Sequence, residues 1–266
     1  MQKKNRSKGG AKKKARKQTS QRPEQKGYEI LFGINSVYEA LKADRRKFFE
    51  IYFSKDPNSK RLQKITEFTK QRDIKVVNET PDKLSILSGS DYHQGVCAKV
   101  SDYPVVDMGA FINIENPFLL LVENVVDPSN LGALIRTAHC AGVDGVITLK
   151  DRAVSHTPSV SRASAGALEH VKFAKVTNMV NCINELKEKG IWVTGLDAKA
   201  ETSLYDANLK GPLAIVVGGE DKGVRPLVQK NCDFLISIPQ HGSFNSLNAS
   251  VAGAIVIYES LRQRQK

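Results

Sequence analysis

The chain has 266 residues, of which 41% are hydrophobic, so it is long enough to form one large domain or two modest ones around a core. Its net charge of +12 is unevenly placed: residues 1–26 hold eleven Lys/Arg and one acid, which leaves about +2 for residues 27–266. No segment approaches the ~20 apolar residues of a membrane span, and the basic start lacks the apolar core of a secretory signal. We therefore expect a cytoplasmic protein with no membrane segment.

Residues 1–26 form a tail rich in Lys, Arg, Gln and Ser. Such a composition has too little apolar surface to bury, so we expect the tail to be disordered. Two interpretations stay open. The tail either keeps the protein soluble or serves as an arm that binds nucleic-acid phosphates without reading sequence, and its charge density favours the arm.

Residues 27–100 alternate helical and strand patterns, which predicts a small α/β domain. Helices are expected from Asn35, as an N-cap, to Lys42 and over 58–72 and 81–87, with strands over 48–54, 75–78 and 95–100. Residues 101–116 are of mixed polarity and contain Pro104 and Gly109, so we interpret them as a linker.

Residues 117–266 alternate apolar strand patterns with helical patterns and form the predicted second domain. Strands are expected over 118–122, 144–149, 171–176, 191–195, 213–217 and 234–238, and helices over 130–141, 158–166, 178–189, 224–231 and 246–263. Apolar strands that alternate with helices predict a parallel sheet covered on both faces.

Two loops of this second domain carry Gly and polar residues directly after predicted strands. One contains Gly218 and Glu220; the other contains Ser243, Asn245, Ser246 and Asn248. Sharp turns at the carboxyl edge of a parallel sheet usually approach a ligand. One carboxylate among neutral hydrogen-bonding groups suits a polar small molecule better than a metal ion.

The helix expected from Asn130, which we interpret as its N-cap, has an apolar stripe at Leu131, Leu134, Ile135 and Ala138. Arg136 points off this stripe. Gly132 costs up to ~1 kcal/mol in a helix relative to Ala, so a close neighbour at its backbone is expected. The residues alone leave two interpretations of this segment: a packing glycine with a solvated arginine, or part of a ligand site.

Metal chemistry is not predicted. Cys97, Cys140, Cys182 and Cys232 are far apart in the sequence and are interpreted as buried thiols of a reducing compartment. No cluster of His and Cys has the spacing of metal ligands. His156, His170 and His241 have no acid nearby in sequence and are expected on the surface or in loops.

Three motifs at strand-to-helix loops occur in a fixed order: Asn130-x-Gly132-Ala133-x-x-Arg136, Gly218-x-Glu220, and Ile238-Pro239 followed by Ser246-Leu247-Asn248. Together they resemble the motifs of the SpoU/TrmH branch of the SPOUT RNA methyltransferases. The first domain, which ends in HQGVCAKV (93–100), resembles the substrate-binding domain of the 23S rRNA guanosine-2′-O-methyltransferase group. The resemblance covers roughly residues 28–263 and implies a parallel-sheet domain with a trefoil knot, which periodicity alone does not predict.

The resemblance also implies a site and a cofactor. Arg136 matches the family's essential catalytic residue, and Asn130, Glu220, Ser246 and Asn248 match its other motif positions. The adenosine part of S-adenosylmethionine is expected against Gly218, Ile238 and Leu247, with the strand end at Thr194, Gly195 and Leu196 lining the same pocket. The family pairs its knotted domains as homodimers, and RNA is the implied partner. The chain has no G-x-G-x-x-G loop of the common dinucleotide-binding type, which agrees with this assignment.

The implied reaction is in-line attack of a ribose 2′-hydroxyl on the sulfonium methyl group, and the hydroxyl must be activated. A guanidinium is almost never neutral at pH 7, so we expect Arg136 to stabilise the developing alkoxide rather than to remove the proton. Three roles stay open for Glu220: balancing the sulfonium charge, orienting Arg136 across a dimer, or fixing a loop. Asn130, Ser246 and Asn248 either bind the ribose or hold loop geometry.

Several further residues keep two interpretations. Arg152, Ser164 and Glu169 contact the substrate or belong to a tightly packed segment, and Tyr28, Phe32, Tyr92 and His93 stack on RNA bases or pack in the core. For the whole chain, we expect a 2′-O-methyltransferase acting on a guanosine of 23S rRNA. The alternatives are the same chemistry on tRNA and a non-catalytic RNA-binding protein of the same fold.

Overall fold

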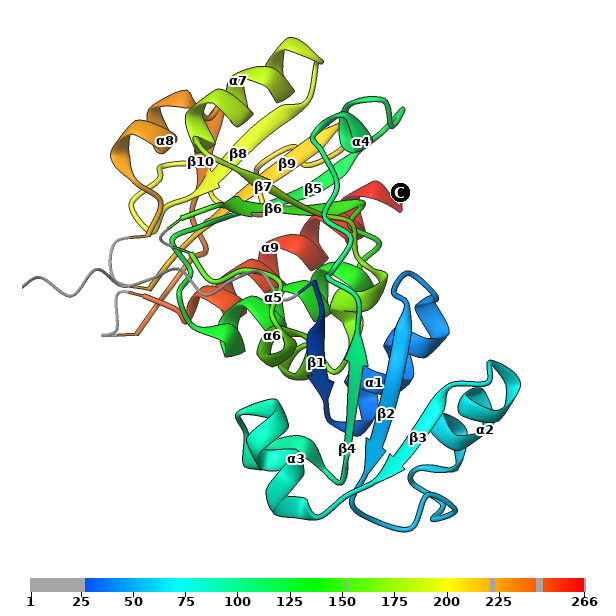
Figure 1. Ribbon diagram of the computed structural model, residues 1–266. Coiled ribbons are helices and arrows are strands. Elements are labelled where there is room, and N and C mark those ends of the chain that lie inside the picture. The colour runs from blue at the N-terminus through cyan, green and yellow to red at the C-terminus, as the bar shows by residue number, and fades with distance from the viewer. Residues whose placement is uncertain (1–26, 152, 221–222, 243–245, 266) are drawn as a thin grey trace, which may run out of the picture.

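The computed structural model describes residues 27–151, 153–220, 223–242 and 246–265 and has two lobes of unequal size (Figure 1). The basic tail, Arg152, Ser243 and Asn245 lie outside the described residues, so the expectations for them are not addressed by the structure. None of the described helices is long and apolar enough to cross a membrane.

The small lobe is a four-stranded sheet with helices packed against it (Figure 1). Its elements are β1 (Glu29–Phe32), α1 (Ile34–Ala43), β2 (Phe48–Phe53), α2 (Gln63–Gln71), β3 (Lys75–Asn78), α3 (Pro81–Ser88), the 3-10 turn η1 (Asp91–His93) and β4 (Val96–Val100). The strand order is β1-β4-β2-β3, in which only β2 and β3 pair in parallel. Strand β1 was not predicted. The N-cap of α1 is Gly33 and not Asn35, because the side-chain oxygen of Gln94 accepts the first helical N–H, that of Ile34, at 2.9 Å.

The large lobe is a six-stranded sheet in which every strand pair is parallel, as the alternating pattern predicts. Its elements are β5 (Phe118–Glu123), α5 (Pro128–Cys140), β6 (Gly145–Leu149), α6 (Pro158–Ala163), the 3-10 turn η2 (Ala167–His170), β7 (Phe173–Val176), α7 (Met179–Glu188), β8 (Trp192–Leu196), β9 (Leu213–Gly218), α8 (Pro226–Asn231), β10 (Phe234–Ile236) and α9 (Ala249–Arg264). The strand order is β10-β8-β9-β5-β6-β7, so the strands that precede the three motif loops, β5, β9 and β10, lie at or near the middle and one edge of the sheet.

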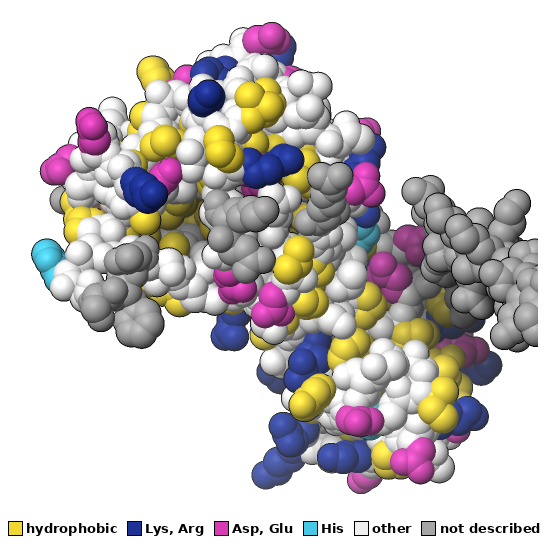
Figure 2. Space-filling view, turned by 90° about the vertical axis from the view of Figure 1, so that its left-hand side faces the viewer, with side chains coloured by type: hydrophobic (Ala, Val, Ile, Leu, Met, Phe, Trp, Pro, Cys, Tyr) yellow, Lys and Arg dark blue, Asp and Glu magenta, His cyan; other side chains and the backbone are white. Residues whose placement is uncertain are grey.

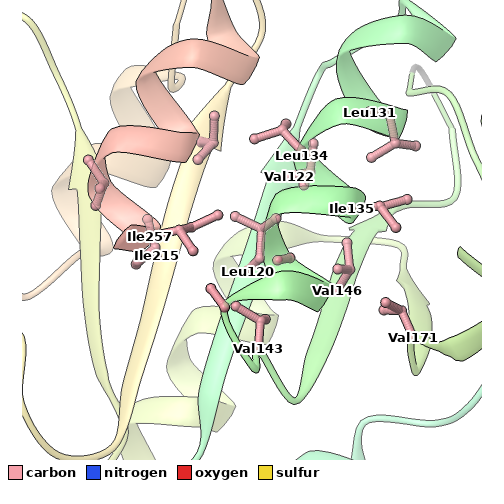
Figure 3. Close-up of a cluster of buried hydrophobic side chains, with 14 of the residues drawn as sticks. Leu120, Val122, Leu131, Leu134, Ile135, Val143, Val146, Val171, Ile215 and Ile257 are labelled. Atoms are coloured by element: carbon pink, nitrogen blue, oxygen red, sulfur yellow. The ribbon is translucent and has the colours of Figure 1, made fainter. Parts of the chain in front are cut away.

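The central strand β5 is buried along its whole length, which explains its continuous apolar sequence. Leu120 and Val122 pack against α5 and α9 in the cluster of Figure 3, while Leu119 and Leu121 join the second cluster, which includes residues of α7 and α8. Each fully buried leucine contributes roughly 1.5–3 kcal/mol. The two clusters hold the sheet between two helical layers and fix the loops at its carboxyl edge.

Residues 101–116, between the lobes, pack against the large lobe. Val106 forms a parallel bridge with Ala174 of β7, and the short helix α4 (Gly109–Ile112) buries Phe111 completely. Gly145 makes room for this ring, because a Cβ at that position would lie 2.0 Å from Phe111 Cε1.

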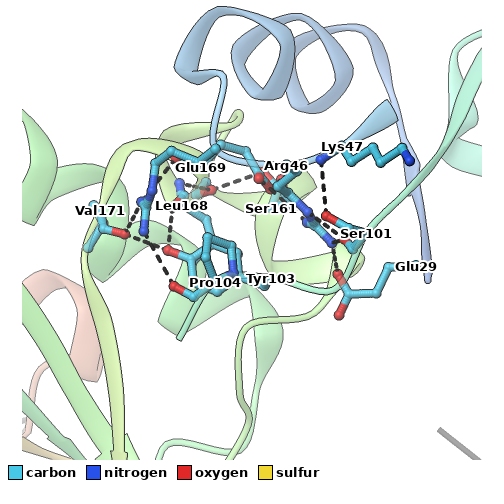
Figure 4. A network of polar contacts seen from close by, with 12 residues as sticks. Glu29, Arg46, Lys47, Ser101, Tyr103, Pro104, Ser161, Leu168, Glu169 and Val171 are labelled. Carbon is cyan, nitrogen blue, oxygen red and sulfur yellow. Dashed lines mark hydrogen bonds and ion pairs between the residues drawn. The ribbon is translucent and has the colours of Figure 1, made fainter. Parts of the chain in front are cut away.

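A buried polar network joins the two lobes (Figure 4). The Arg46 side chain ion-pairs with Glu29 of β1 and with Glu169 of η2, the latter at 3.5 Å, and donates to the Ser101 carbonyl. Burial raises the pKa of Glu169, while Arg46 and a 2.7 Å hydrogen bond from Ser161 Oγ oppose that rise. We call Arg46, Glu29 and Glu169 the lobe junction. Since few of its groups face water, it holds the lobes in one relative position.

The structure decides several single-residue expectations, and only those for two cysteines were wrong. His170 does have an acidic partner: its Nε2 lies 2.7 Å from the carboxylate of Glu39, 131 positions away. Cys140 is exposed and Cys232 is half-buried, so only Cys97 and Cys182 are buried as expected. Glu169 and Ser164 are buried, and Ser164 Oγ donates to the Ser161 carbonyl, so both belong to the packing of the lobes rather than to a substrate surface.

Candidate active site

The three sequence motifs meet through one side chain each at the carboxyl edge of the large sheet. Both Asn130 of α5 and Asn248, before α9, donate their side-chain amides to the same oxygen of Glu220, from Asn248 at 2.9 Å. Asn248 Nδ2 also donates to Asn130 Oδ1 at 3.0 Å. We call these three residues the motif junction. It ties together loops that are up to 118 positions apart.

Asn130 is available for this role because it does not cap its helix, contrary to the expectation. Asp127 is the N-cap of α5 and accepts the N–H of Ser129 at 2.8 Å, while Pro128 occupies the first helical position. Asn130 therefore lies inside the first turn, only 8% exposed, with its side chain directed to Glu220 and Asn248.

Asn248 has two functions in the structure. Its side-chain oxygen accepts the N–H groups of Ser250 and Val251 at 2.9 and 3.3 Å, which caps α9. Its side-chain NH₂ group remains for Glu220 and Asn130. The cap thus orients the amide that enters the motif junction.

The loop after β9 requires glycine at two successive positions. A Cβ on Gly218 would lie 2.0 Å from the carbonyl carbon of Gly223, and one on Gly219 would lie 2.2 Å from the carbonyl oxygen of Asn124. Both distances are far below a normal contact. This close approach of backbone brings Glu220 back over the start of α5.

A cavity of about 510 Å³ opens beside the motif junction, at the carboxyl ends of β8, β9 and β10. It is lined by six of the residues predicted for the site: Leu196, Gly218, Glu220, Ile238, Ser246 and Leu247. Apolar Val217 and Ile236 form part of its wall, and Asp197, held at 2.6 Å by Gln229, supplies a carboxylate. The size and the mixture of apolar wall with a few polar groups suit a ligand of nucleoside size.

Two residues predicted for the pocket do not line it. Thr194 is fully buried within β8, and Gly195 faces Leu235 and Cys232, where a Cβ would lie 2.9 Å from Leu235 Cδ2. Strand β8 reaches the cavity with its last residue, Leu196, so the two residues before it support the wall from behind.

Arg136 lies away from the motif junction. It is exposed on α5, as its position off the apolar stripe predicts, and no described side chain or carbonyl forms a hydrogen bond or ion pair with it. It also does not line the cavity of its own chain. Gly132 packs closely against Ala163 of α6, which confirms the close neighbour expected at its backbone. Arg136 follows Gly132 by about one helical turn. Its exposed position leaves the guanidinium accessible from outside the chain.

Sequence reasoning missed Glu123 and Arg225. Glu123 ends β5 with no exposed surface and accepts from Arg225 Nε at 2.6 Å and from Arg225 N at 3.0 Å. This pair holds the chain that leads from the Gly218 loop into α8. A carboxylate at the end of a wholly apolar strand was the available signal, since such a group needs a cationic partner when buried.

The donors at this edge are amides, hydroxyls and single carboxylates. Among the described residues there is no group of three or more His, Cys, Asp or Glu that would hold a metal ion. The site therefore has the fold and polarity of a nucleotide-type pocket at the edge of a parallel sheet.

Family profiles match both lobes. The profile of the SpoU rRNA Methylase family matches residues 117–258, and a profile described as RNA 2′-O ribose methyltransferase substrate binding matches residues 30–106. The fold and the site thus define the class of SpoU-type methylases with an appended substrate-binding domain. This chain belongs to the SpoU rRNA methylase family.

Curated relatives and solved structures extend over nearly the whole chain. The 23S rRNA (guanosine-2′-O-)-methyltransferase RlmB of Ralstonia nicotianae is 38% identical over 89% of this chain and 96% of its own. A protein of Bacillus subtilis named putative TrmH family tRNA/rRNA methyltransferase YacO is 38% identical with the same coverage.

Among solved structures, an RNA 2′-O ribose methyltransferase aligns with a TM-score of 0.78 at 24% identity, covering 91% of both chains. The SpoU methyltransferase AviRb of Streptomyces viridochromogenes, solved in complex with AdoMet, aligns at 0.77 and 23% identity, covering 90% of this chain and 91% of its own. These likenesses show the two-lobed fold.

Proposed function

We propose that the protein is an S-adenosylmethionine-dependent RNA 2′-O-ribose methyltransferase that methylates a guanosine of 23S rRNA. The observation that carries this proposal is the motif junction beside the cavity, because it joins the three family motifs through side-chain contacts. The rRNA substrate is supported by the names of relatives such as RlmB and by the match of the small lobe to a substrate-binding profile.

The cavity residues fit the methyl donor. Gly218, Ile238 and Leu247 would hold the adenosine through backbone groups and apolar contact, with Leu196 at the wall. When bound, S-adenosylmethionine supplies a sulfonium methyl group. Asp197, a carboxylate on the lining, would balance its positive charge.

The protein's part in the reaction is to orient and to stabilise charge. Of the three roles open for Glu220, its two hydrogen bonds from Asn130 and Asn248 favour fixing the loops around the reacting groups. Arg136 has no competing partner among the described residues, so its guanidinium is free to stabilise alkoxide character on the ribose oxygen. Ser246, on the cavity wall, is available to bind the ribose.

A homodimer is part of the proposal. Exposed apolar side chains lie on and beside α9 and α5: Val126 is 69% exposed, Val251 48% and Tyr258 50%. A second copy would cover them, and Arg136 lies on the same helix α5 but outside its own chain's cavity. Sedimentation equilibrium tests this, and a monomer at micromolar concentration would contradict it. The family's trefoil knot also stays a prediction.

In this proposal each segment of the chain has its own role: a basic arm (1–26), an RNA-binding lobe (27–100), a connecting segment (101–116) and a catalytic lobe (117–266). The protein would act in the cytoplasm, where rRNA is assembled. Deletion of residues 1–26 should weaken RNA affinity and flatten its salt dependence, because each lost phosphate contact removes roughly 0.7–0.9 from the logarithmic slope. An unchanged slope would leave the tail as a solubilising segment.

Methyl transfer from labelled S-adenosylmethionine to 23S rRNA and to tRNA tests the function directly. We expect label in 23S rRNA as 2′-O-methylguanosine, identified by mass spectrometry of nuclease digests. Transfer to tRNA alone would favour the alternative of the same chemistry on tRNA, which the name of YacO also includes. If no RNA were labelled by a protein that still binds RNA, the non-catalytic alternative would replace the proposal.

A further inference from the structure

Three arginines differ from all the others that the structure describes. Nine arginines lie in the described residues, and six of them donate hydrogen bonds to carboxylates or carbonyls: Arg45, Arg46, Arg72, Arg225, Arg262 and Arg264. Arg61, Arg136 and Arg162 are exposed and have no such oxygen partner among those residues. Because the other six guanidinium groups already donate to protein oxygens, these three are the described arginines free to bind an external anion.

Arg162 lies at the boundary of the two lobes. It belongs to α6 of the large lobe, and its guanidinium carbon lies 4.5 Å from the ring centroid of Tyr92 in η1 of the small lobe. A Cβ on Gly33, just before α1, would lie 3.7 Å from Arg162 Cγ. Of the four N-terminal aromatic candidates, Tyr92 is 67% exposed, Phe32 and His93 are buried, and Tyr28 is half-buried with Lys99 Nζ 4.3 Å from its ring centroid. One aromatic ring with an arginine against it therefore remains open to solvent.

Arg61 lies in the small lobe, beside the start of α1. Together with Ile34, Asn35 and Gln94 it lines a shallow hollow of about 220 Å³ at the start of α1. Gln94 fills the helix end itself, since its oxygen accepts the Ile34 N–H. The positive charge at this hollow therefore comes from the Arg61 side chain.

The third arginine, Arg136, belongs to the large lobe. Helices α5 and α6 meet where Gly132 contacts Ala163, the neighbour of Arg162, and Arg136 is one turn, about 5.4 Å, further along α5 on nearly the same face. Arg61 and Arg162 thus lie at the lobe boundary by the start of α1, and Arg136 lies on α5, the helix that packs against the helix of Arg162. We call these three arginines the row. On the face seen in Figure 2, Lys and Arg side chains also gather on the small lobe below this boundary.

The chemistry of this row fits single-stranded RNA. Guanidinium groups bind phosphates in a planar, bidentate manner, and exposed aromatic rings bind bases that are not already stacked in a helix. An acidic protein surface would satisfy the arginines but would not use the open face of Tyr92. A base-paired helix would offer phosphates but no free base.

We propose that Arg61, Arg162 and Tyr92 form the surface over which an unpaired segment of the substrate RNA reaches Arg136, with phosphates on the two arginines and a base stacked on Tyr92. This inference rests on the proposed function. It names residues outside the three family motifs that would select the substrate. It also predicts that the target nucleotide lies in a loop or other unpaired segment.

The test measures RNA affinity and methyl transfer separately. Fluorescence anisotropy with a 23S rRNA hairpin fragment and with its fully paired counterpart gives the dissociation constant as a function of salt, and methyl transfer gives kcat and KM. The variants are Arg61→Gln, Arg162→Gln, Tyr92→Ala and Tyr92→Phe. Arg72→Gln is the matched control, because it removes the same charge from the small lobe at a residue paired with Asp44.

We expect each arginine variant to bind the hairpin about threefold to tenfold more weakly and to lower the logarithmic salt slope by roughly 0.7–0.9. Tyr92→Ala should weaken binding about fivefold or more, Tyr92→Phe should restore it, and kcat at saturating RNA should stay within about twofold. Arg72→Gln should match the wild type.

Two results would overturn the inference: wild-type affinity in Arg61→Gln, Arg162→Gln and Tyr92→Ala, or equally tight binding of the paired and unpaired RNA. Either result with methyl transfer intact would leave the proposed function standing. If the wild type transfers no methyl group, the binding measurements still decide whether the row binds RNA.

Discussion

The motif junction and the lobe junction are both built from polar side chains that lie far apart in the sequence, yet their surroundings differ. At the lobe junction, Arg46 is 5% exposed and each of its donors meets a carboxylate or carbonyl. At the motif junction, Glu220 is exposed and borders a cavity. Burial makes the first a device for stability and position, whereas access to the cavity leaves the second free to serve a ligand. Mutations should therefore separate the two.

The largest effect on stability is expected from Arg46→Met. The substitution leaves Glu169 buried without its cation, and removing one partner of a buried ion pair costs about 3–5 kcal/mol. Urea denaturation measures the loss of unfolding free energy. A double variant that also carries Glu169→Gln should recover part of it, and no recovery would show that the pairing is not the cause.

Arg136→Ala is the converse case. Because Arg136 is exposed and has no partner among the described residues, its removal should leave the unfolding free energy within about 0.5 kcal/mol of the wild type. Methyl transfer should fall about 10²- to 10³-fold, the usual effect of losing one charge-stabilising donor. Single-turnover rates at saturating RNA measure it, with Arg136→Lys as the variant that keeps charge but not shape. An unchanged rate would contradict the assigned role.

Lowering the pH should reduce the stability of the fold through His156, which lies near the boundary of the lobes. Its ring lies 4.9 Å from that of Tyr103, and burial, helped by the charges of Lys175 and Arg46, lowers its pKa from 6.5 to about 4. A lowered histidine pKa means that the folded state favours the neutral ring. The stability this provides is complete above pH 6.5 and is lost as the pH falls towards 4, by about 3 kcal/mol.

This contribution can be measured from the unfolding free energy of the wild type and of His156→Gln between pH 7.5 and 4. It is the difference between the two slopes of free energy against pH. The variant should lose less stability on acidification. Parallel curves would assign the acid sensitivity to other groups.

The smallest change in stability is expected from substitutions of Asn248, which can separate its two functions. Asn248→Ala removes the α9 cap and should cost about 1 kcal/mol of stability, whereas Asn248→Ser keeps a capping oxygen and should cost much less. Both lose the amide donated to Glu220 and should lower methyl transfer equally. Thermal denaturation and initial rates test this pair, and activity that follows stability would contradict a separate role for the amide.

The sequence predicted the large lobe better than the site's contacts. Apolar strands between helical patterns define a parallel sheet locally, so β5 to β10 were each found with bounds within two residues. The N-cap prediction at Asn130 was wrong, although Asp127-Pro128 offers a stronger start signal, with its cap three residues earlier. Glu220 and Asn130 are 90 positions apart, and their hydrogen bond depends on how the sheet brings loops together, which no local pattern records.

Family motifs marked residues around the cavity but not the supports behind them. Thr194 and Gly195 were expected on its wall because strand ends line such pockets, yet only the last residue of β8 reaches it. Glu123 and Arg225 were missed because a buried pair is recognised only when both partners are seen together.

The contact between Gly132 and Ala163 has a mechanical consequence. A Cβ at residue 132 would lie 2.5 Å from Ala163 Cβ and 2.9 Å from the backbone of Ser164, so even a methyl group would push α6 away from α5. Helix α6 also packs against β1 of the small lobe, and Arg46 ties that strand to η2 just beyond α6. A single hydrogen atom at Gly132 thus sets the spacing between the lobe that would hold the RNA and the helix that would meet its ribose, and any larger residue there would put the two out of register.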